Sequence, residues 1–135
     1  MNGLIRVTPD KEKANSILKM VNKTLEMVKE IDIGRFPSNV TKEYYEVIRE
    51  LISIVLLLDG YKVAGEGAHK KLIEYLESNY KQFGAYRISL IDELRIIRNR
   101  IAYDGFFVKK DYLERKLGDI KIIINELNQI IKDRL

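Results

Sequence analysis

The sequence predicts an all-α protein, an antiparallel up-and-down bundle of about five helices folded as one domain over residues 1–135. Apolar residues recur at intervals of three and four along most of the chain, which is the period of a helix with one buried face. Glycines and prolines separate these stretches, and the connections are short, as they are between antiparallel neighbours in a bundle. No segment alternates convincingly between apolar and polar residues, so no strand is predicted.

The first helix is predicted to begin at Thr8-Pro9, with the threonine as its N-cap and the proline at the first helical position. Its end is expected before Gly34 and Pro37, because both residue types stop helices. The apolar residues between these limits recur at helical spacing: Ala14, Ile17, Val21, Leu25 and Val28.

The second helix is predicted to be capped by Thr41 and to end at Asp59-Gly60. Residues 54–58 near its end are all apolar, so this stretch has no polar face. Such a helix is either the most buried one of the bundle or one that also faces a partner subunit.

Three more segments complete the predicted bundle. A glycine-bearing loop is expected over 61–67, followed by a shorter helix whose apolar face holds Leu72, Ile73, Leu76 and Tyr80. The fourth helix carries Leu90, Leu94, Ile97 and Ile101, and it ends at Gly105, since glycine commonly follows a helix C-terminus. The last helix begins near Lys109 and repeats the pattern with Leu113, Leu117, Ile120, Ile124, Leu127 and Ile131.

The composition excludes several classes of function. The chain has no cysteine and one histidine, which leaves zinc too few of the ligands it favours, so no metal site and no cofactor are expected. The formal net charge of +4 is compatible with phosphate-bearing partners without requiring them. The N-terminus lacks the apolar core of a signal peptide, and the most apolar run, 51–58, is too short to span a bilayer. We therefore expect a cytoplasmic protein with no membrane association.

The strongest functional signal lies at 98–105, where an Arg-Asn pair near the end of the fourth helix is followed by a tyrosine and then a glycine. At 100° per residue, Arg98 and Tyr103 point about 140° apart on a straight helix, whereas Arg95, Asn99 and Tyr103 share a face. Arg98 and Tyr103 could converge only if the last helical turn unwinds. An arginine here suits phosphate because its planar guanidinium donates two parallel hydrogen bonds and stays charged. The alternative is purely structural, with Arg98 bonded to an acidic residue across the bundle.

The segment Arg98-Asn99-Arg100-Ile101-Ala102-Tyr103 resembles the Arg-Asn-x-x-x-His motif of the HEPN superfamily, with tyrosine in place of histidine. The stretch from Tyr44 to His69 is similar to the second helix and following loop of small prokaryotic HEPN proteins, and the resemblance extends over about 14–131. It implies a homodimer across the motif-bearing helices. Many members are metal-independent endoribonucleases, some of them toxins paired with a small nucleotidyltransferase, whereas others are binding or assembly modules.

The resemblance also implies a site. In active members the arginine holds phosphate and the histidine helps to move the ribose proton; the matching residues, and so the candidate catalytic ones, are Arg98, Asn99 and Tyr103. The candidate phosphate- or RNA-binding residues are Arg95, Arg98, Arg100 and His69.

Tyrosine changes what this site can do. Histidine titrates near neutrality, but a phenol has an ordinary pKa of about 10 and is a poor general base. We therefore expect an RNA- or nucleotide-phosphate-binding protein with little or no nuclease turnover. One alternative is a metal-independent endoribonuclease toxin of a toxin–antitoxin module. Its turnover would need a phenol pKa depressed by Arg95 and Arg98, a tyrosine that acts only as an acid, or a remote base, for which His69 is the candidate. The other alternative is an interaction module for a nucleotidyltransferase partner.

Overall fold

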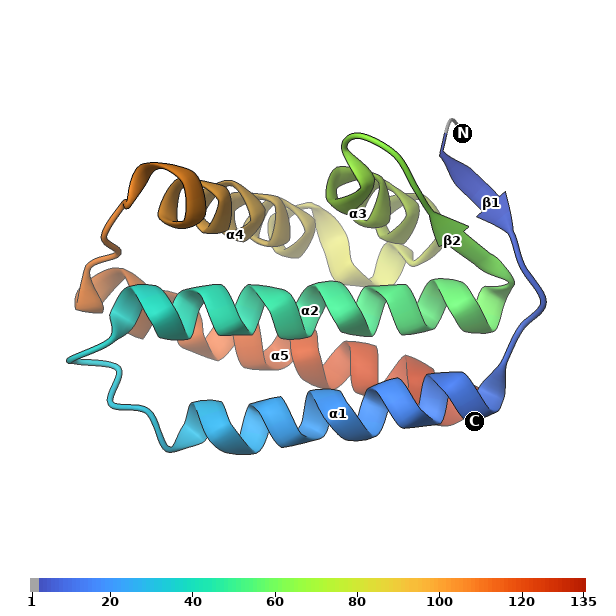
Figure 1. Ribbon diagram of the computed structural model, residues 1–135, viewed down its shortest axis with the longest axis horizontal. Coiled ribbons are helices and arrows are strands. Elements are labelled where there is room, and N and C mark those ends of the chain that lie inside the picture. Colours follow the sequence, from blue (N-terminus) through green and yellow to red (C-terminus); the bar gives the residue numbers. More distant parts are fainter. Residues whose placement is uncertain (1–2) are drawn as a thin grey trace.

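The computed structural model describes residues 3–135 and confirms the predicted all-α bundle (Figure 1). A short 3₁₀ turn, Lys81–Phe83, connects the third and fourth helices. The five α-helices follow the chain order: α1 (Lys11–Lys29), α2 (Pro37–Asp59), α3 (Ala68–Asn79), α4 (Gly84–Asp104) and α5 (Lys110–Arg134).

Helix α2 is the central element, as its apolar end predicts. It contacts each of the other four helices, and thirteen of its 23 residues are buried, the largest number in any element. In Figure 1, α1 runs alongside α2 on one side and α5 lies behind it, while α4 and α3 follow one another along the opposite side. In the segment 54–58 every residue except Leu57 is buried, and Leu57 is partly buried.

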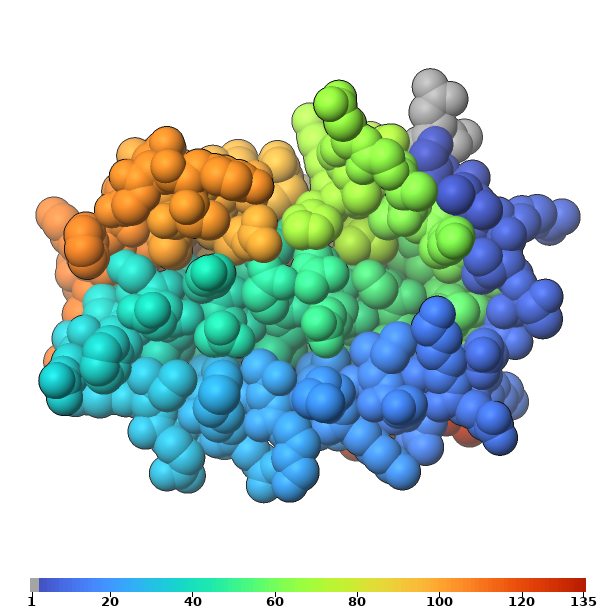
Figure 2. Space-filling view, in the orientation of Figure 1, coloured from blue at the N-terminus to red at the C-terminus, as the bar shows by residue number. Residues whose placement is uncertain are grey.

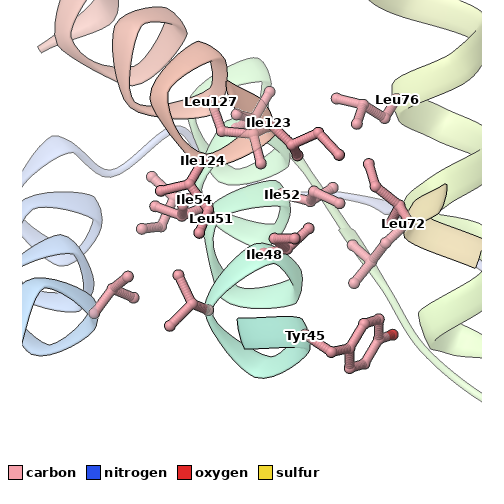
Figure 3. Close-up of a cluster of buried hydrophobic side chains, with 14 of the residues drawn as sticks. Tyr45, Ile48, Leu51, Ile52, Ile54, Leu72, Leu76, Ile123, Ile124 and Leu127 are labelled. Carbon is pink, nitrogen blue, oxygen red and sulfur yellow. The ribbon is translucent and has the colours of Figure 1, made fainter. Parts of the chain in front are cut away.

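The core lies where α2, α3 and α5 meet (Figure 3). Leu51 and Ile52 of α2, Leu76 of α3 and Leu127 of α5 are all nearly inaccessible to solvent. Truncating such a side chain to alanine costs about 2–5 kcal/mol in proteins generally. This packing fixes the position of α3 against α2 and thereby the position of the residues at the start of α3.

The structure corrects the prediction that there is no strand. Strands β1 (Leu4–Arg6) and β2 (Tyr61–Val63) form a two-stranded antiparallel sheet, with Ile5 opposite Lys62. Strand β2 occupies the first part of the predicted 61–67 loop. Three residues per strand are too few for a two-residue period to be recognised, which is why the pattern missed them.

The predicted starts of the first two helices are also wrong. Helix α1 begins after Asp10, whose carboxylate accepts a hydrogen bond from the backbone N–H of Lys13 at 2.9 Å, so aspartate and not Thr8 is the N-cap. Helix α2 begins at Pro37, because a proline at the first helical position loses no intrahelical hydrogen bond. Thr41 is inside that helix and buried, and its hydroxyl donates to the carbonyl oxygen of Pro37 at 2.7 Å.

One polar cluster ties the ends of three helices together at the edge of the core. The Asp59 carboxylate at the end of α2 accepts hydrogen bonds from the hydroxyls of Tyr75 at 2.7 Å and Tyr80 at 2.8 Å. It also accepts a hydrogen bond from Arg134 at the end of α5, and that guanidinium donates to the carbonyl oxygen of Leu58 as well. We call these residues, Asp59, Tyr75, Tyr80 and Arg134, the carboxylate clasp.

Among residues 3–135, no helix has the length and apolar character needed to cross a membrane.

Candidate phosphate-binding site

Arg98 reaches across the bundle from α4 to α2. Its Nε donates to Oε1 of Glu46 at 2.9 Å, and its Nη1 donates to the side-chain oxygen of Asn99 at 3.2 Å. Both members of the Arg98–Glu46 ion pair are half-buried, with 23% and 22% of their side chains exposed. Arg98 therefore makes the cross-bundle contact that a structural role predicts, while its Nη2 donates no hydrogen bond within residues 3–135.

Glu46 holds a second arginine of α2 at the same time. Arg49 donates to Oε2 of Glu46 from Nε at 3.0 Å and from Nη2 at 2.8 Å. Burial alone would raise the pKa of the Glu46 carboxyl, but the hydrogen bonds and charges of Arg49 and Arg98 outweigh it and hold this pKa below its ordinary value. Glu46 is thus ionised at neutral pH and keeps two guanidinium groups side by side.

Arg95 adds a third guanidinium, one helical turn before Arg98 on α4. Its Nε donates to the carboxylate of Asp92 at 2.9 Å, an i,i+3 pair on the same helix. Only 19% of its side chain is exposed. Within the described part of the chain, neither terminal nitrogen of Arg95 donates a hydrogen bond. We call the three side chains Arg49, Arg95 and Arg98 the arginine cluster.

His69 at the start of α3 borders the arginine cluster. Its ring lies against Tyr45, the residue before Glu46, with the ring centroids 6.2 Å apart. Burial lowers the pKa of His69, and the charges of Arg49 and Arg98, and more weakly Arg95, lower it further, while Glu46 opposes them. The imidazole is therefore neutral at physiological pH. Figure 2 shows the segment around residues 60–70 next to α4 along the same edge of α2.

Tyr45 itself does not act as an acid or a base near neutral pH. Burial raises the pKa of Tyr45 to about 12, and only 1% of the residue is exposed. It serves as the apolar surface against which His69 is placed.

Tyr103 lies apart from the arginine cluster. Helix α4 stays regular through Asp104 and ends at Gly105 in the left-handed conformation, with φ of 64°. The last turn therefore does not unwind, and Arg98 and Tyr103 do not converge within one protomer. Tyr103 is 79% exposed.

Arg100 faces another side of α4, where its guanidinium lies 4.1 Å from the ring centroid of Phe106. Of the predicted site residues, the structure brings Arg95, Arg98, Asn99 and His69 into one region and leaves Arg100 and Tyr103 outside it.

Two residues of the site were missed by the sequence prediction. Glu46 and Arg49 lie in the stretch that supports the HEPN resemblance, and their i,i+3 spacing on a helix is a recognisable ion-pair signal. Their proximity to Arg98 could not be inferred, because it depends on the register between α2 and α4. No group of three metal-ligating side chains occurs among residues 3–135.

A groove of about 690 Å³ lies between α4 and α5. Its lining combines apolar side chains with charged ones of both signs. Two of the apolar lining residues are exposed, Phe107 at 84% and Ile96 of α4 at 47%.

Comparison with known protein families, with characterised proteins and with solved structures finds no match to this chain.

Proposed function

We propose that this protein binds RNA or a nucleotide through phosphate groups at the arginine cluster. The observation that carries the proposal is a set of hydrogen-bond donors without acceptors in the described residues: both terminal nitrogens of Arg95 and Nη2 of Arg98. Guanidinium groups are well suited to phosphate oxygens, and their half-buried setting strengthens the attraction relative to a fully exposed surface. The resemblance of 98–103 to the HEPN motif supports the same function.

Glu46 and Asp92 offset part of the positive charge of the arginine cluster, but they do not occupy all of its hydrogen-bond donors. Glu46 and Asp92 together use one nitrogen of Arg95, one of Arg98 and two of Arg49. A phosphate can therefore bind to the remaining nitrogens while the carboxylates keep the guanidinium planes in place. Such preorganisation reduces the entropy that is lost when a ligand binds.

The motif at 98–103 has the phenol of Tyr103 where the HEPN motif has a histidine, and this phenol lies outside the arginine cluster. It is a poor base, so the motif at 98–103 supplies no proton acceptor of its own.

A direct test is the affinity of a labelled single-stranded RNA oligonucleotide for three proteins. Arg98→Ala should weaken binding roughly tenfold, about 1.4 kcal/mol, because a phosphate contact is lost. The slope of log affinity against log salt should fall by about 0.7, the value for one contact with a single strand. Arg115→Ala removes an exposed arginine of α5 outside the arginine cluster and should have little effect. Equal affinities for Arg98→Ala and the parent protein would refute the proposal.

The proposed binding unit is a homodimer that pairs the outer faces of two α4 helices. Five of the exposed residues of α4 recur at alternating intervals of four and three: Ser89, Glu93, Ile96, Arg100 and Tyr103. If two copies pack antiparallel around an axis near Ile96, Glu93 of each copy faces Arg100 of the other. The same packing covers Ile96 and places Tyr103 opposite the small Ser89 of the second copy. The face is therefore complementary to itself in charge and in size, as a two-fold contact requires.

A further inference from the structure

The three arginines of the proposed phosphate-binding site do not line the α4–α5 groove. The volume of the groove, about 690 Å³, falls within the range of about 300–1,000 Å³ that is usual for small-molecule sites. Five apolar side chains of its lining range from buried to exposed, in the order Val108, Ile97, Phe106, Ile96 and Phe107. The groove can therefore shield the apolar part of a small molecule from water.

The loop that joins α4 to α5 is held in place at the groove. Gly105 ends α4 in the left-handed conformation, and the backbone N–H of Val108 donates to Oγ of Ser38 in α2 at 2.7 Å. Val108 and Ser38 are both buried. Phe106 and Phe107 lie between these two fixed points, so the aromatic wall of the groove is preorganised although Phe107 is exposed. Preorganisation reduces the entropy that is lost when a ligand binds.

Two arginines that line the groove lie on aromatic rings. Cζ of Arg100 is 4.1 Å from the ring centroid of Phe106, and Cζ of Arg115 is 5.9 Å from that of Tyr112. Within residues 3–135, neither guanidinium donates a hydrogen bond or forms an ion pair. A guanidinium that is stacked on a ring keeps its N–H edge free, and two parallel N–H groups suit a carboxylate.

The acidic side chains of the lining, in contrast, already have favourable contacts. Oδ1 of Asp92 accepts a hydrogen bond from Nε of Arg95 at 2.9 Å. Oε2 of Glu93 accepts one from the Tyr112 hydroxyl at 2.6 Å. Asp111 lies in the first turn of α5, where the helix dipole stabilises a negative charge. The groove therefore favours an added anion, and its three acidic side chains repel a doubly charged phosphate more than a singly charged carboxylate.

We propose that the α4–α5 groove binds a small organic acid with an aromatic or alicyclic body and one carboxylate. The body lies against Phe106 and Phe107, and the carboxylate accepts hydrogen bonds from Arg100 or Arg115. This site is independent of phosphate binding at the arginine cluster. The α4 wall of the groove also belongs to the proposed α4–α4 contact, so the acid binds to copies that are not paired through α4.

The test uses two fluorescent probes with the same aromatic body. Anilinonaphthalenesulfonate has one negative charge, and N-phenylnaphthylamine lacks the sulfonate and is neutral. Both are titrated into the protein at a concentration at which sedimentation shows a monomer, and the anion should bind more tightly. The double variant Arg100→Gln and Arg115→Gln should weaken binding of the anion about three- to tenfold and leave binding of the neutral probe nearly unchanged. Arg35→Gln removes an arginine stacked on Phe36 outside the groove and should change neither.

Two further measurements locate the probe and define its charge. Phe107→Ala should weaken both probes, because it removes part of the aromatic wall. Met20→Ala, which removes an exposed apolar side chain from α1, should weaken neither. Naphthoate should displace the bound sulfonate at a lower concentration than naphthyl phosphate, which has the same rings and a phosphate that is doubly charged at neutral pH.

Each result bears directly on the proposal. Tighter binding of the anionic probe that depends on the two groove arginines and on Phe107 supports it. Equal affinities of the two probes, or an equal loss for both in the arginine double variant, would overturn it. Unchanged binding in Phe107→Ala would place the probes elsewhere and would overturn it as well. Stronger displacement by naphthyl phosphate than by naphthoate would contradict the carboxylate. The affinity of RNA for Arg98→Ala is a separate measurement, so failure here leaves the proposed function intact.

Discussion

Glu46 accepts hydrogen bonds from two arginines on different helices, one on each carboxylate oxygen. Three cationic side chains packed in a half-buried region repel one another, and this carboxylate offsets the repulsion between Arg49 and Arg98. Removing one partner of a half-buried ionic group is generally more costly than the pair itself is stabilising, because the other charge is left without compensation.

Glu46→Gln should therefore destabilise the fold by about 1–3 kcal/mol, since an amide is neutral and cannot accept both arginines equally well. Urea denaturation followed by circular dichroism measures the change. Inorganic phosphate should stabilise the variant more than the parent protein, because it supplies the negative charge that the substitution removes. Glu77→Gln on the exposed side of α3 is the matched control. Equal stabilisation of parent and variant by phosphate would contradict a binding role for these arginines.

His69 makes stability depend on pH. Its folded-state pKa lies below the unfolded value, so between these two values the unfolded chain binds more protons than the native one. The contribution of His69 to stability is fully present above pH 6.5 and is lost as the pH falls through the lower, folded-state pKa. We expect the free energy of unfolding to fall as the pH drops below 6.5, and to fall less in His69→Gln. Parallel pH dependences of the two proteins would show that other groups are responsible.

At the residue scale, the sequence predicted which side chains of α4 lie beside the apolar stripe but not what they contact. Arg98 and Asn99 are half-buried, as their position next to Leu94 and Ile101 indicates. The partners of Arg98 belong to a helix about fifty residues earlier in the chain, and helix periodicity contains no information about that pairing. The proximity of His69 has the same origin, because it depends on how α3 packs against α2.

At the scale of elements, the carboxylate clasp is the polar counterpart of the apolar core. It joins the C-terminal ends of α2 and α5 to Tyr75 in α3 and to Tyr80 directly after it. Burial, together with the bond to the Asp59 carboxylate, raises the pKa of Tyr80 to about 12, so this phenol remains a hydrogen-bond donor at any physiological pH. The pKa of Tyr75 is raised for the same reasons.

Asp59→Asn should lower the free energy of unfolding by about 2 kcal/mol, because hydrogen bonds to a charged group each contribute about 1.5–3 kcal/mol and Arg134 would lose its counter-charge. The midpoint of urea denaturation should fall at unchanged slope. Hydrogen exchange should accelerate most at the end of α5, which Arg134 fastens to α2. Tyr80→Phe removes a single donor and should have a smaller effect, about 1 kcal/mol. A larger loss in Tyr80→Phe than in Asp59→Asn would mean that Asp59 is not the centre of the clasp.

The elements that were predicted correctly are the ones whose periodic pattern is long. The buried stripes of α1, α2 and α5 repeat over at least three turns. Helices α2 and α4 end at Gly60 and Gly105 as predicted, and both glycines adopt the left-handed conformation. The starts of α1 and α2 were misplaced because several residues near each start can act as a cap, and tertiary packing selects among them. Thr41 does not cap α2, because it lies inside the helix and is buried against the core.

At the scale of the whole molecule, one surface of α4 exposes large apolar side chains to solvent. Ile96 and Tyr103 expose apolar area on α4, and Phe107 adds more at the edge of the α4–α5 groove. Burying apolar surface contributes about 25 cal/mol per Å². Pairing of two α4 faces would cover Ile96 and Tyr103, and it would place two arginine clusters, one from each copy, on either side of the paired helices.

Charge reversal across the proposed α4–α4 contact can test this arrangement without touching the arginine cluster. Glu93→Arg would place like charges opposite each other twice in a two-fold dimer, at Arg100 of each copy, so the variant should sediment as a monomer at concentrations where the parent is a dimer. Adding Arg100→Glu exchanges the two charges and recreates both pairs with opposite polarity, so the double variant should dimerise again. Like charges that face each other across an interface cost several kcal/mol, which makes the expected difference large.

The double variant also controls for damage to the fold. Glu93 accepts a hydrogen bond from the Tyr112 hydroxyl at 2.6 Å, and Arg100 stacks on Phe106, so each single change also removes a contact within the protomer. Both of these intramolecular contacts are lost in the double variant as well. Recovery of the dimer there can come only from restored pairing between copies, whereas a monomer in both variants, or a dimer in both, would rule out the antiparallel α4 contact. Because the Glu93–Arg100 contact is electrostatic and exposed at its edge, the dimer of the parent protein should also weaken as salt concentration rises.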